Sequence, residues 1–284
     1  MAGDEKRFKR AFDSLHAFVY FVPEVEAALT GAGLRPGRMP YFAGRSAAMG
    51  AVGPEVVAAT FYNFNPEVVA RVIPRAWTLA TPEQVLEARL AGAGQALTRL
   101  LGDHVKSDEV AEAAELAREA TAGCRAEGRP LYAAHAGLDW PGEPHLVLWH
   151  AVTLLREHRG DGHIAALVLE GLSGIEALVT HVATGRGFLT QAVKLTRGWS
   201  DDEWTAAESA LKDRGLLDGD GALTDAGTAL RDRLEIATEA AARGPWDHLG
   251  PEKTARLEEL CRGLSTRVID AGAFPAGVFA QGRP

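Results

Sequence analysis

The sequence predicts a mainly α-helical protein with two domains: a helical N-terminal domain, residues 1–140, and a C-terminal domain, residues 141–284, that adds one small β-hairpin. Two observations carry this fold class. Proline followed by glutamate recurs where helices are expected to begin, and alternating strand patterns are nearly absent before Leu216. A chain of 284 residues with 46% hydrophobic content is long enough to bury two cores.

Helix-start signals punctuate the N-terminal part. Proline costs nothing at the first helical position, because its missing N–H has no partner there, and glutamate faces the positive end of the helix dipole. These signals, with Ser-Asp-Glu at Ser107, predict helices over residues 23–30, 54–65, 66–73, 82–101 and 107–125. A stretch rich in glycine and proline, 128–144, marks a soft boundary between the two domains.

Two helices are expected after this boundary, His145–His158 and His163–Ala183. A turn at Arg159–Gly162 should separate them, because its two glycines allow the chain to change direction. The last helix, Glu252–Ile269, carries an apolar stripe typical of a packing or dimer helix, and we expect a homodimer through this end of the chain. The stripe consists of Leu257, Leu260, Leu264 and Val268.

The segment from Phe188 to Gly215 predicts a helix pair. Phe188–Arg197 forms a short helix, and a turn follows at Gly198. Ser200 with Glu203 three residues later is a capping box, in which each side chain satisfies an amide donor of the new helix. Gly215 lies where a left-handed C-terminal cap belongs. This punctuation indicates a helix-turn-helix.

A β-hairpin is expected directly after the pair. Leu216–Leu217 and Ala222–Leu223 are short apolar runs around a turn, Asp218–Gly221, and Thr224 caps a further helix. A helix pair, a hairpin and a return helix together give the order of a winged helix-turn-helix domain, with the hairpin as its wing.

Several stretches resemble the MarR-type regulators: Leu189–Gln191, Gly198–Ser200, Arg214–Leu217 and Asp220–Gly227. The whole chain is also similar to an uncharacterised actinobacterial winged helix-turn-helix family. The resemblance implies that the second helix of the pair enters the major groove of duplex DNA. It makes Thr205, Ser209 and Lys212 the candidate DNA-binding residues.

The charge of this segment opposes DNA binding. Residues 198–240 contain eleven acidic side chains and four basic ones, so they carry −7 of the chain's net charge of −8. The second helix begins Asp201-Asp202-Glu203, and the predicted wing is acidic where the regulators place arginine. Because an unneutralised carboxylate repels DNA phosphate, duplex DNA is a possible but disfavoured partner.

The densest polar cluster lies between residues 150 and 163. It predicts a small-molecule pocket in which an arginine grips an anion and a histidine transfers a proton or ligates a metal or haem iron. The structural alternative is a helix end whose cations complement the dipole, followed by a turn held by Arg–Asp pairs. No metal-ligand spacing is present, and the cofactor stays unknown. The candidate ligand-binding residues are His150, Arg156, Glu157, His158, Arg159, Asp161 and His163.

A second candidate pocket combines Tyr41–Arg45 with Phe61–Phe64. Aromatic rings supply an apolar wall, and Arg45, Tyr62 and Asn63 supply the few oriented polar groups that a ligand site needs. Such aromatics are alternatively plain core. No nucleophile elbow or dinucleotide-binding motif accompanies them, so no particular reaction is indicated.

These observations predict a small-molecule-binding winged-helix protein that acts as a ligand-responsive transcriptional regulator. The alternative is an enzyme or ligand carrier on the same scaffold, without DNA binding, that uses the arginine and histidine cluster of residues 150–163. A long apolar run and a signal peptide are both lacking, so we expect a cytoplasmic protein with no membrane partner. The two cysteines are far apart and indicate neither a disulfide framework nor a zinc site.

Overall fold

The computed structural model describes residues 12–185 and 189–275, which are almost entirely helical. Residues 12–17 are helical and lead into the first labelled element. The elements are η1 (Phe18–Tyr20), α2 (Pro23–Gly31), α3 (Arg38–Ser46), η2 (Ala47–Met49), α4 (Pro54–Phe61), α5 (Pro66–Ala70), α6 (Ile73–Leu79), α7 (Pro82–Leu101), η3 (Gly102–Lys106), α8 (Asp108–Thr121), α9 (Pro130–Ala136), α10 (Pro144–Leu169), α11 (Gly174–Val182), α12 (Thr190–Arg197), α13 (Asp201–Asp213), α14 (Asp225–Ala242), α15 (Gly244–Leu249) and α16 (Pro251–Asp270).

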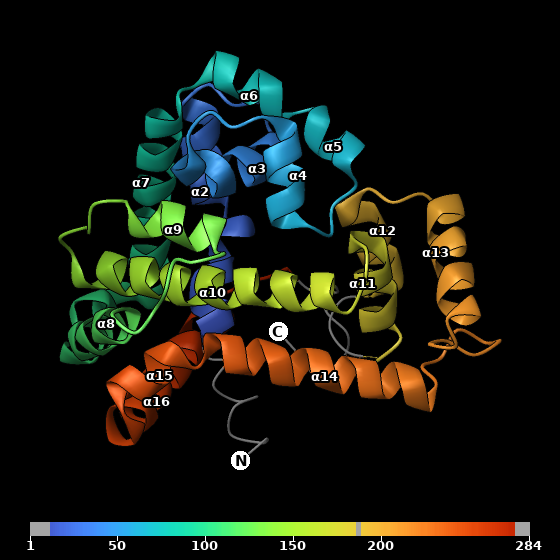
Figure 1. Cartoon of the computed structure of the whole chain (residues 1–284). Coiled ribbons are helices and arrows are strands. Elements are labelled where there is room, and N and C mark those ends of the chain that lie inside the picture. Colours follow the sequence, from blue (N-terminus) through green and yellow to red (C-terminus); the bar gives the residue numbers. More distant parts are fainter. Residues whose placement is uncertain (1–11, 186–188, 276–284) are drawn as a thin grey trace.

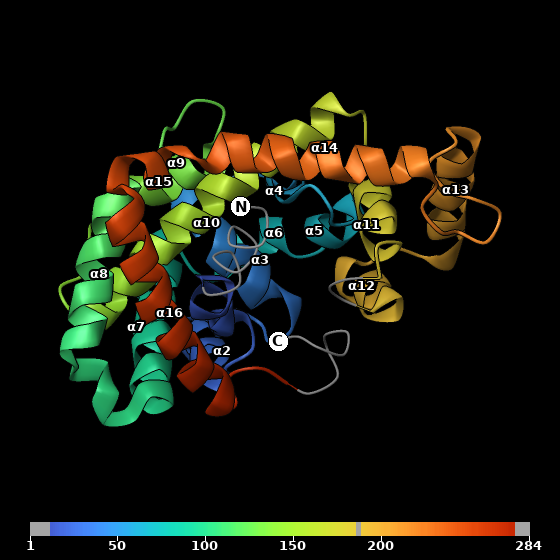
Figure 2. The same cartoon turned by 90° about the horizontal axis from the view of Figure 1, so that it is seen from below.

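Helix α10 runs through the middle of the molecule, and α14 lies alongside it (Figure 1). Helices α2 to α6 lie on one side of α10, whereas α11, α12 and α13 stand at its C-terminal end (Figure 1). At the other end, α15 and α16 pack along α8 (Figure 2), and Phe274, after α16, packs against Phe21 near the start of the chain. We call α11 to α14 the helix-turn-helix segment, and the remaining helices the body.

Local signals explain why most helices begin where they do. Proline occupies the first turn of α2, α4, α5 and α7, which confirms the predicted helix starts. The predicted capping box is also confirmed: Ser200 accepts from the Glu203 amide, and the Glu203 carboxylate accepts from the Ser200 amide. Gly215 has the expected left-handed conformation, with φ of +69°.

The described residues form three hydrophobic cores, one of which lies among α3 to α6 and contains Phe42, Val57 and Phe61. The body core joins α2, α7, α8 and α10 with α16, whose apolar stripe is buried against its own chain. This core therefore contains residues from both sides of the expected boundary at residue 140. The remaining core lies inside the helix-turn-helix segment, where Trp204 and Leu211 of α13 pack with Leu234 of α14. The predicted homodimer stays a prediction.

The turn predicted at Arg159–Gly162 is wrong, because α10 continues through both glycines as one helix of 26 residues. The structural alternative of a capped turn fails for the same reason. Glycine weakens a helix by about 1 kcal/mol but does not end it, and packing on both sides overrides that cost. At Gly162 a side chain would lie 3.0 Å from Ala241 Cβ, so here the glycine lets α14 approach.

The predicted β-hairpin wing is also wrong. No strand occurs in the described ranges, and residues 216–223 form a tight loop with one isolated antiparallel bridge, Leu217 to Leu223. The Asp218 carboxylate explains the loop, because it accepts from the amides of Asp220 and Ala222 at 3.0 and 2.9 Å. These local bonds compete with a ladder, and each arm is too short to extend one. The mainly α class holds without the wing.

Candidate ligand-binding site

A cavity of about 410 Å³ lies between the body and the helix-turn-helix segment. Its walls come from α3, α4 and the second half of α10 on one side and from α11, α12 and α14 on the other. We call it the central cavity. The structure places residues of both predicted polar clusters on its wall, although their role in binding stays a prediction. They are Arg45, Tyr62, Asn63, Arg156, Arg159, Asp161 and His163.

Glu157 lies behind this wall and is paired with two arginines. Arg45 donates to both carboxylate oxygens, at 3.2 and 2.8 Å, and Arg156 Nη1 donates to Oε1 at 3.3 Å. Burial alone would raise the pKa of Glu157, but the two guanidinium groups hold it well below its ordinary value. Glu157 is therefore an ionised counter-ion for the wall and is too deeply buried to meet a ligand.

His150 and His158 do not reach the cavity. They lie about 140° around α10 from His163, because each helical residue turns by about 100°. His150 packs edge-on against Trp140, with ring centroids 4.7 Å apart, and His158 packs on Tyr132. Burial lowers the pKa of both histidines to about 4, so they are neutral at pH 7. Both are packing residues of the body.

Asp161 lines the edge of the cavity and also holds α9 in place. Its Oδ2 accepts from the backbone amides of Leu131 and Tyr132, at 3.0 and 2.9 Å, and so holds the start of α9 against α10. Burial raises its pKa to about 6, although the two amides act in the opposite sense. A ligand therefore meets a carboxylate that is already engaged by the backbone.

Arg159 and His163 connect α10 with α14. Arg159 Nη2 donates to Glu239 Oε1 at 2.5 Å and to Glu235 Oε2 at 3.3 Å. His163 Nδ1 lies 2.8 Å from the hydroxyl of Thr238. Both side chains thus contribute to the wall while they fix the spacing of the two long helices.

Aromatic rings from α3 and α4 form the apolar part of the wall. Tyr41 packs against Phe61 and Phe64, with ring centroids 6.2 and 5.4 Å apart, and Arg45 stacks over Phe61 at 4.4 Å. Phe61 and Phe64 are buried, whereas Tyr41 is half-buried. The rings therefore serve partly as core and partly as a flat surface for a ligand.

The loop 62–65 joins the cavity wall to the turn between α12 and α13. Trp199 Nε1 donates to the Asn63 carbonyl at 3.0 Å. The Asn65 amide donates to the Arg197 carbonyl at 2.9 Å, and its side chain donates to Glu203 Oε1 at 3.0 Å. A displacement of this loop would therefore move the helix-turn-helix turn.

The same loop contains an unusual backbone conformation. Tyr62 is the one non-glycine residue in the described ranges with a positive φ, 57°. Its carbonyl lies so close to α11 that a side chain at Gly174 would come within 2.0 Å of it. Such strain persists only where surrounding contacts enforce it, and it is frequent at functional sites.

Two arginines on the segment side of the cavity were not among the predicted site residues. Arg197 of α12 stacks over Phe64 at 4.4 Å, and Arg231 of α14 is 8% exposed. The only sequence signal for Arg231 is its spacing, three residues before Leu234, and which elements cover that side of α14 follows from packing.

The candidate DNA-binding residues lie on the exposed side of α13. Thr205, Ser209 and Lys212 are all exposed. Thr205 follows the acidic first turn of the helix, whereas Lys212 lies in its last turn. Lys212 Nζ donates to the Gly219 carbonyl at 2.8 Å and so braces the following loop. Their contact with DNA stays a prediction.

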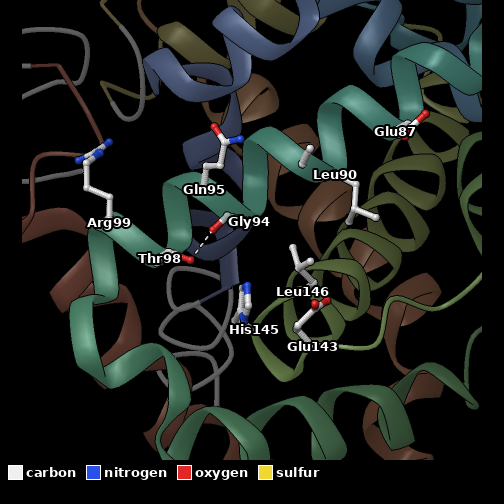
Figure 3. Close-up of a pocket in the computed structure, with 10 residues that line it drawn as sticks. Glu87, Leu90, Gly94, Gln95, Thr98, Arg99, Glu143, His145 and Leu146 are labelled. Atoms are coloured by element: carbon white, nitrogen blue, oxygen red, sulfur yellow. Dashed lines mark hydrogen bonds between the residues drawn. The ribbon is translucent and has the colours of Figure 1, made fainter.

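A larger hollow, about 750 Å³, lies on the surface of the body between α7 and the start of α10. Figure 3 shows residues of α7, among them Leu90 and Thr98, facing His145 and Leu146 across it. None of the predicted site residues lines this groove. The helices that line it, α7 and the start of α10, stand at the opposite end of α10 from α11 to α13 (Figure 1). The central cavity is therefore the stronger candidate.

Two further findings concern the described ranges alone. They contain no group of three histidine, cysteine, aspartate or glutamate side chains placed to hold a metal ion. No single helix in them is both long and apolar enough to cross a membrane; only α10 and α11 taken together, across a 99° bend, pass that test. Helix α10 is the buried central helix of the fold.

Comparison with known proteins gives one match. A family model described as "Helix-turn-helix family" matches residues 5–275, nearly the whole chain. No curated protein and no solved structure matches the chain. The match supports the helix-turn-helix prediction without the finer resemblance to MarR-type or actinobacterial proteins.

Proposed function

The chain belongs to a helix-turn-helix family, and from that premise we propose that it is a ligand-responsive transcriptional regulator whose small-molecule site is the central cavity. One observation carries the proposal: the body forms one side of the cavity and the helix-turn-helix segment forms the other. A ligand in this position contacts both parts. The ligand therefore favours the relative position of the body and the helix-turn-helix segment in which it makes the best contacts, as an allosteric effector does.

The loop 62–65 supplies the connection from ligand to DNA. Tyr62 and Asn63 line the cavity, and Asn63 and Asn65 bond to the turn that precedes α13. In our proposal α13 enters the major groove with Thr205 and Ser209 toward the bases. A cytoplasmic homodimer would present two such helices to two half-sites.

One observation favours a second candidate function, a ligand carrier or enzyme without DNA binding. Every basic side chain within residues 198–240 is engaged by its own chain. The contacts are Lys212 with the Gly219 carbonyl, Arg214 with Glu176, Arg231 with His181 and Arg233 with Glu170. A DNA phosphate would have to replace these partners and overcome the net charge of −7.

Duplex-DNA binding distinguishes the two candidates. We would measure fluorescence anisotropy of a labelled mixed-sequence duplex at about 50 and 200 mM salt, where phosphate contacts give strong salt dependence. For a regulator, Thr205→Glu should abolish binding, whereas Thr266→Glu, which adds the same charge on exposed α16, should not. Absence of binding at both salt concentrations, with the purified protein carrying a small molecule, would establish the carrier or enzyme.

Native mass spectrometry and absorbance of freshly purified protein complete this experiment. They report a co-purified ligand or chromophore and the oligomeric state in one measurement. A monomer without ligand or DNA binding would contradict both candidate functions.

A further inference from the structure

Arg231 is a buried cation on the wall of the central cavity. It comes from α14, is 8% exposed, and contacts His181 Nδ1 at 3.5 Å. In the described ranges it forms no ion pair with a carboxylate. Asp232, the next residue, is exposed to solvent. Glu235, one turn further along α14, acts on Arg231 electrostatically but makes its ion pair with Arg159.

The arginines on the body side of the cavity, in contrast, all have carboxylate partners. Arg45 and Arg156 share the carboxylate of Glu157, and Arg159 is held by Glu235 and Glu239. No acidic side chain on the wall is available to Arg231. Glu239 accepts from Arg159, Asp161 accepts from the backbone amide of Leu131, and Asp13 is exposed to solvent. The wall therefore keeps positive charge at Arg231.

A buried charge without a counter-ion costs several kcal/mol, and a bound anion removes that cost. Arginine presents a planar fork that matches the oxygens of a carboxylate, sulfonate or phosphate. The cavity also contains the rings of Tyr41, Phe61 and Phe64, which suit a flat apolar body. Its volume, about 410 Å³, is in the range of small-molecule sites.

We infer that the ligand is an organic anion with a flat apolar body, and that Arg231 pairs with its acidic group. This inference rests on the proposed ligand site and names its chemical class. Because Arg231 belongs to the helix-turn-helix segment and the aromatic wall belongs to the body, such an anion ties the two parts together through its opposite ends.

The test compares two fluorescent probes with the same skeleton. Anilinonaphthalenesulfonate carries a sulfonate, and N-phenylnaphthylamine is uncharged. Both should bind the full-length protein in a saturable, one-to-one manner. In Arg231→Gln the dissociation constant of the sulfonate should rise about tenfold or more, equivalent to about 1.4 kcal/mol. That of the neutral probe should change less than about twofold.

Two variants serve as references. Arg231→Lys keeps the charge but loses the planar fork of the guanidinium group. Its affinity for the sulfonate should therefore lie between those of the unmodified protein and Arg231→Gln. Arg233→Gln removes an exposed arginine of the same helix that pairs with Glu170 outside the cavity, and should bind both probes as the unmodified protein does. Thermal unfolding of each variant verifies that it is folded.

A measurement on the unmodified protein makes the test independent of these variants. Naphthalenesulfonate should displace the neutral probe about tenfold better than naphthalenemethanol does. Equal displacement, or equal loss of both probes in folded Arg231→Gln, would overturn the anion inference while leaving the ligand site intact. Failure of the unmodified protein to bind either probe would overturn the proposed ligand site itself.

Discussion

At the scale of single residues, the central cavity depends on a buried charge cluster. Glu157 is 1% exposed and accepts hydrogen bonds from Arg45 and Arg156. The sequence predicted this carboxylate as a ligand-binding residue, but the structure makes it the counter-ion of two residues that line the cavity. Helical spacing could not reveal this role, because Arg45 comes from a distant part of the chain.

Replacing Glu157 should therefore be costly. Glu157→Gln leaves Arg45 buried without its counter-ion, and breaking one partner of a buried pair typically costs about 3 kcal/mol. We expect a large decrease in the urea midpoint of unfolding. Glu67→Gln provides the control, since Glu67 and Arg71 form an exposed pair that should contribute almost nothing. Similar midpoints for the two variants would contradict the importance of the buried cluster.

At the scale of elements, local signals predicted most helix starts, and tertiary contacts decided the rest. Proline and capping residues act within one turn, so Pro54, Pro66 and Ser200 could be interpreted from sequence. The continuity of α10 through Gly160 and Gly162 depends on α14, which a local pattern does not contain. The prediction of a β-hairpin wing was wrong for the converse reason. The local Asp218 carboxylate accepts from the amides of Asp220 and Ala222 and holds the segment as a loop, without the expected ladder of strand hydrogen bonds.

Sequence patterns could group only some of the residues that line the candidate cavity, for a similar reason. Residues of both polar clusters reach one cavity, as a pocket would require, but only the fold determines that they meet. His150 and His158 belong to the polar cluster of residues 150–163 in sequence, but the helix directs them toward Trp140 and Tyr132. Arg231 was missed because its inward direction follows from packing of α14 on α10 and α11.

The turn between α12 and α13 offers an element-scale prediction. Gly198 has φ of +78°, and a side chain there would meet Val68 Cγ2 at 2.3 Å. Gly198→Ala should therefore combine backbone strain of about 1–2 kcal/mol with a steric clash that detaches the turn from α5. Gly215→Ala is the matched control, because Gly215 has φ of +69° with no atom within 4 Å of the added carbon.

Amide hydrogen exchange of α12 and α13 measures the difference between these two variants. Gly198→Ala should lower protection across both helices, whereas Gly215→Ala should lower global stability slightly and leave the relative protection of α12 and α13 unchanged. Equal patterns in both variants would show that the contact with Val68 does not hold the turn.

At the scale of the whole molecule, buried histidines determine how stability depends on pH. Burial lowers the pKa of His135, His150 and His158 to about 4, from about 6.5 in an unfolded chain. Between pH 4 and 6.5, these histidines are therefore protonated in the unfolded chain but neutral in the folded protein. Because protonation favours the unfolded chain, the free energy of unfolding is highest above pH 6.5 and decreases as the pH falls toward 4.

Asp161 acts in the opposite direction. Its pKa is raised to about 6, so the folded protein keeps one proton that the unfolded chain releases above about pH 4. That contribution is present at low pH and disappears as pH rises through 6. The proton that Asp161 keeps on folding offsets the proton that one buried histidine loses. The other two histidines still make folding less favourable as the pH falls.

We therefore expect the thermal unfolding midpoint to fall between pH 7 and 5 at constant ionic strength. Each net proton changes the free energy of unfolding by about 1.4 kcal/mol per pH unit. His150→Phe keeps a ring against Trp140 without a titrating group, so it should flatten the pH dependence by about one proton. Thr266→Asn, which changes an exposed residue of α16 without a titrating group, should leave the pH dependence unchanged. A midpoint that stays constant over this range in the unmodified protein would mean that the buried histidines accept protons in the folded state, and hence that the core around α10 admits water.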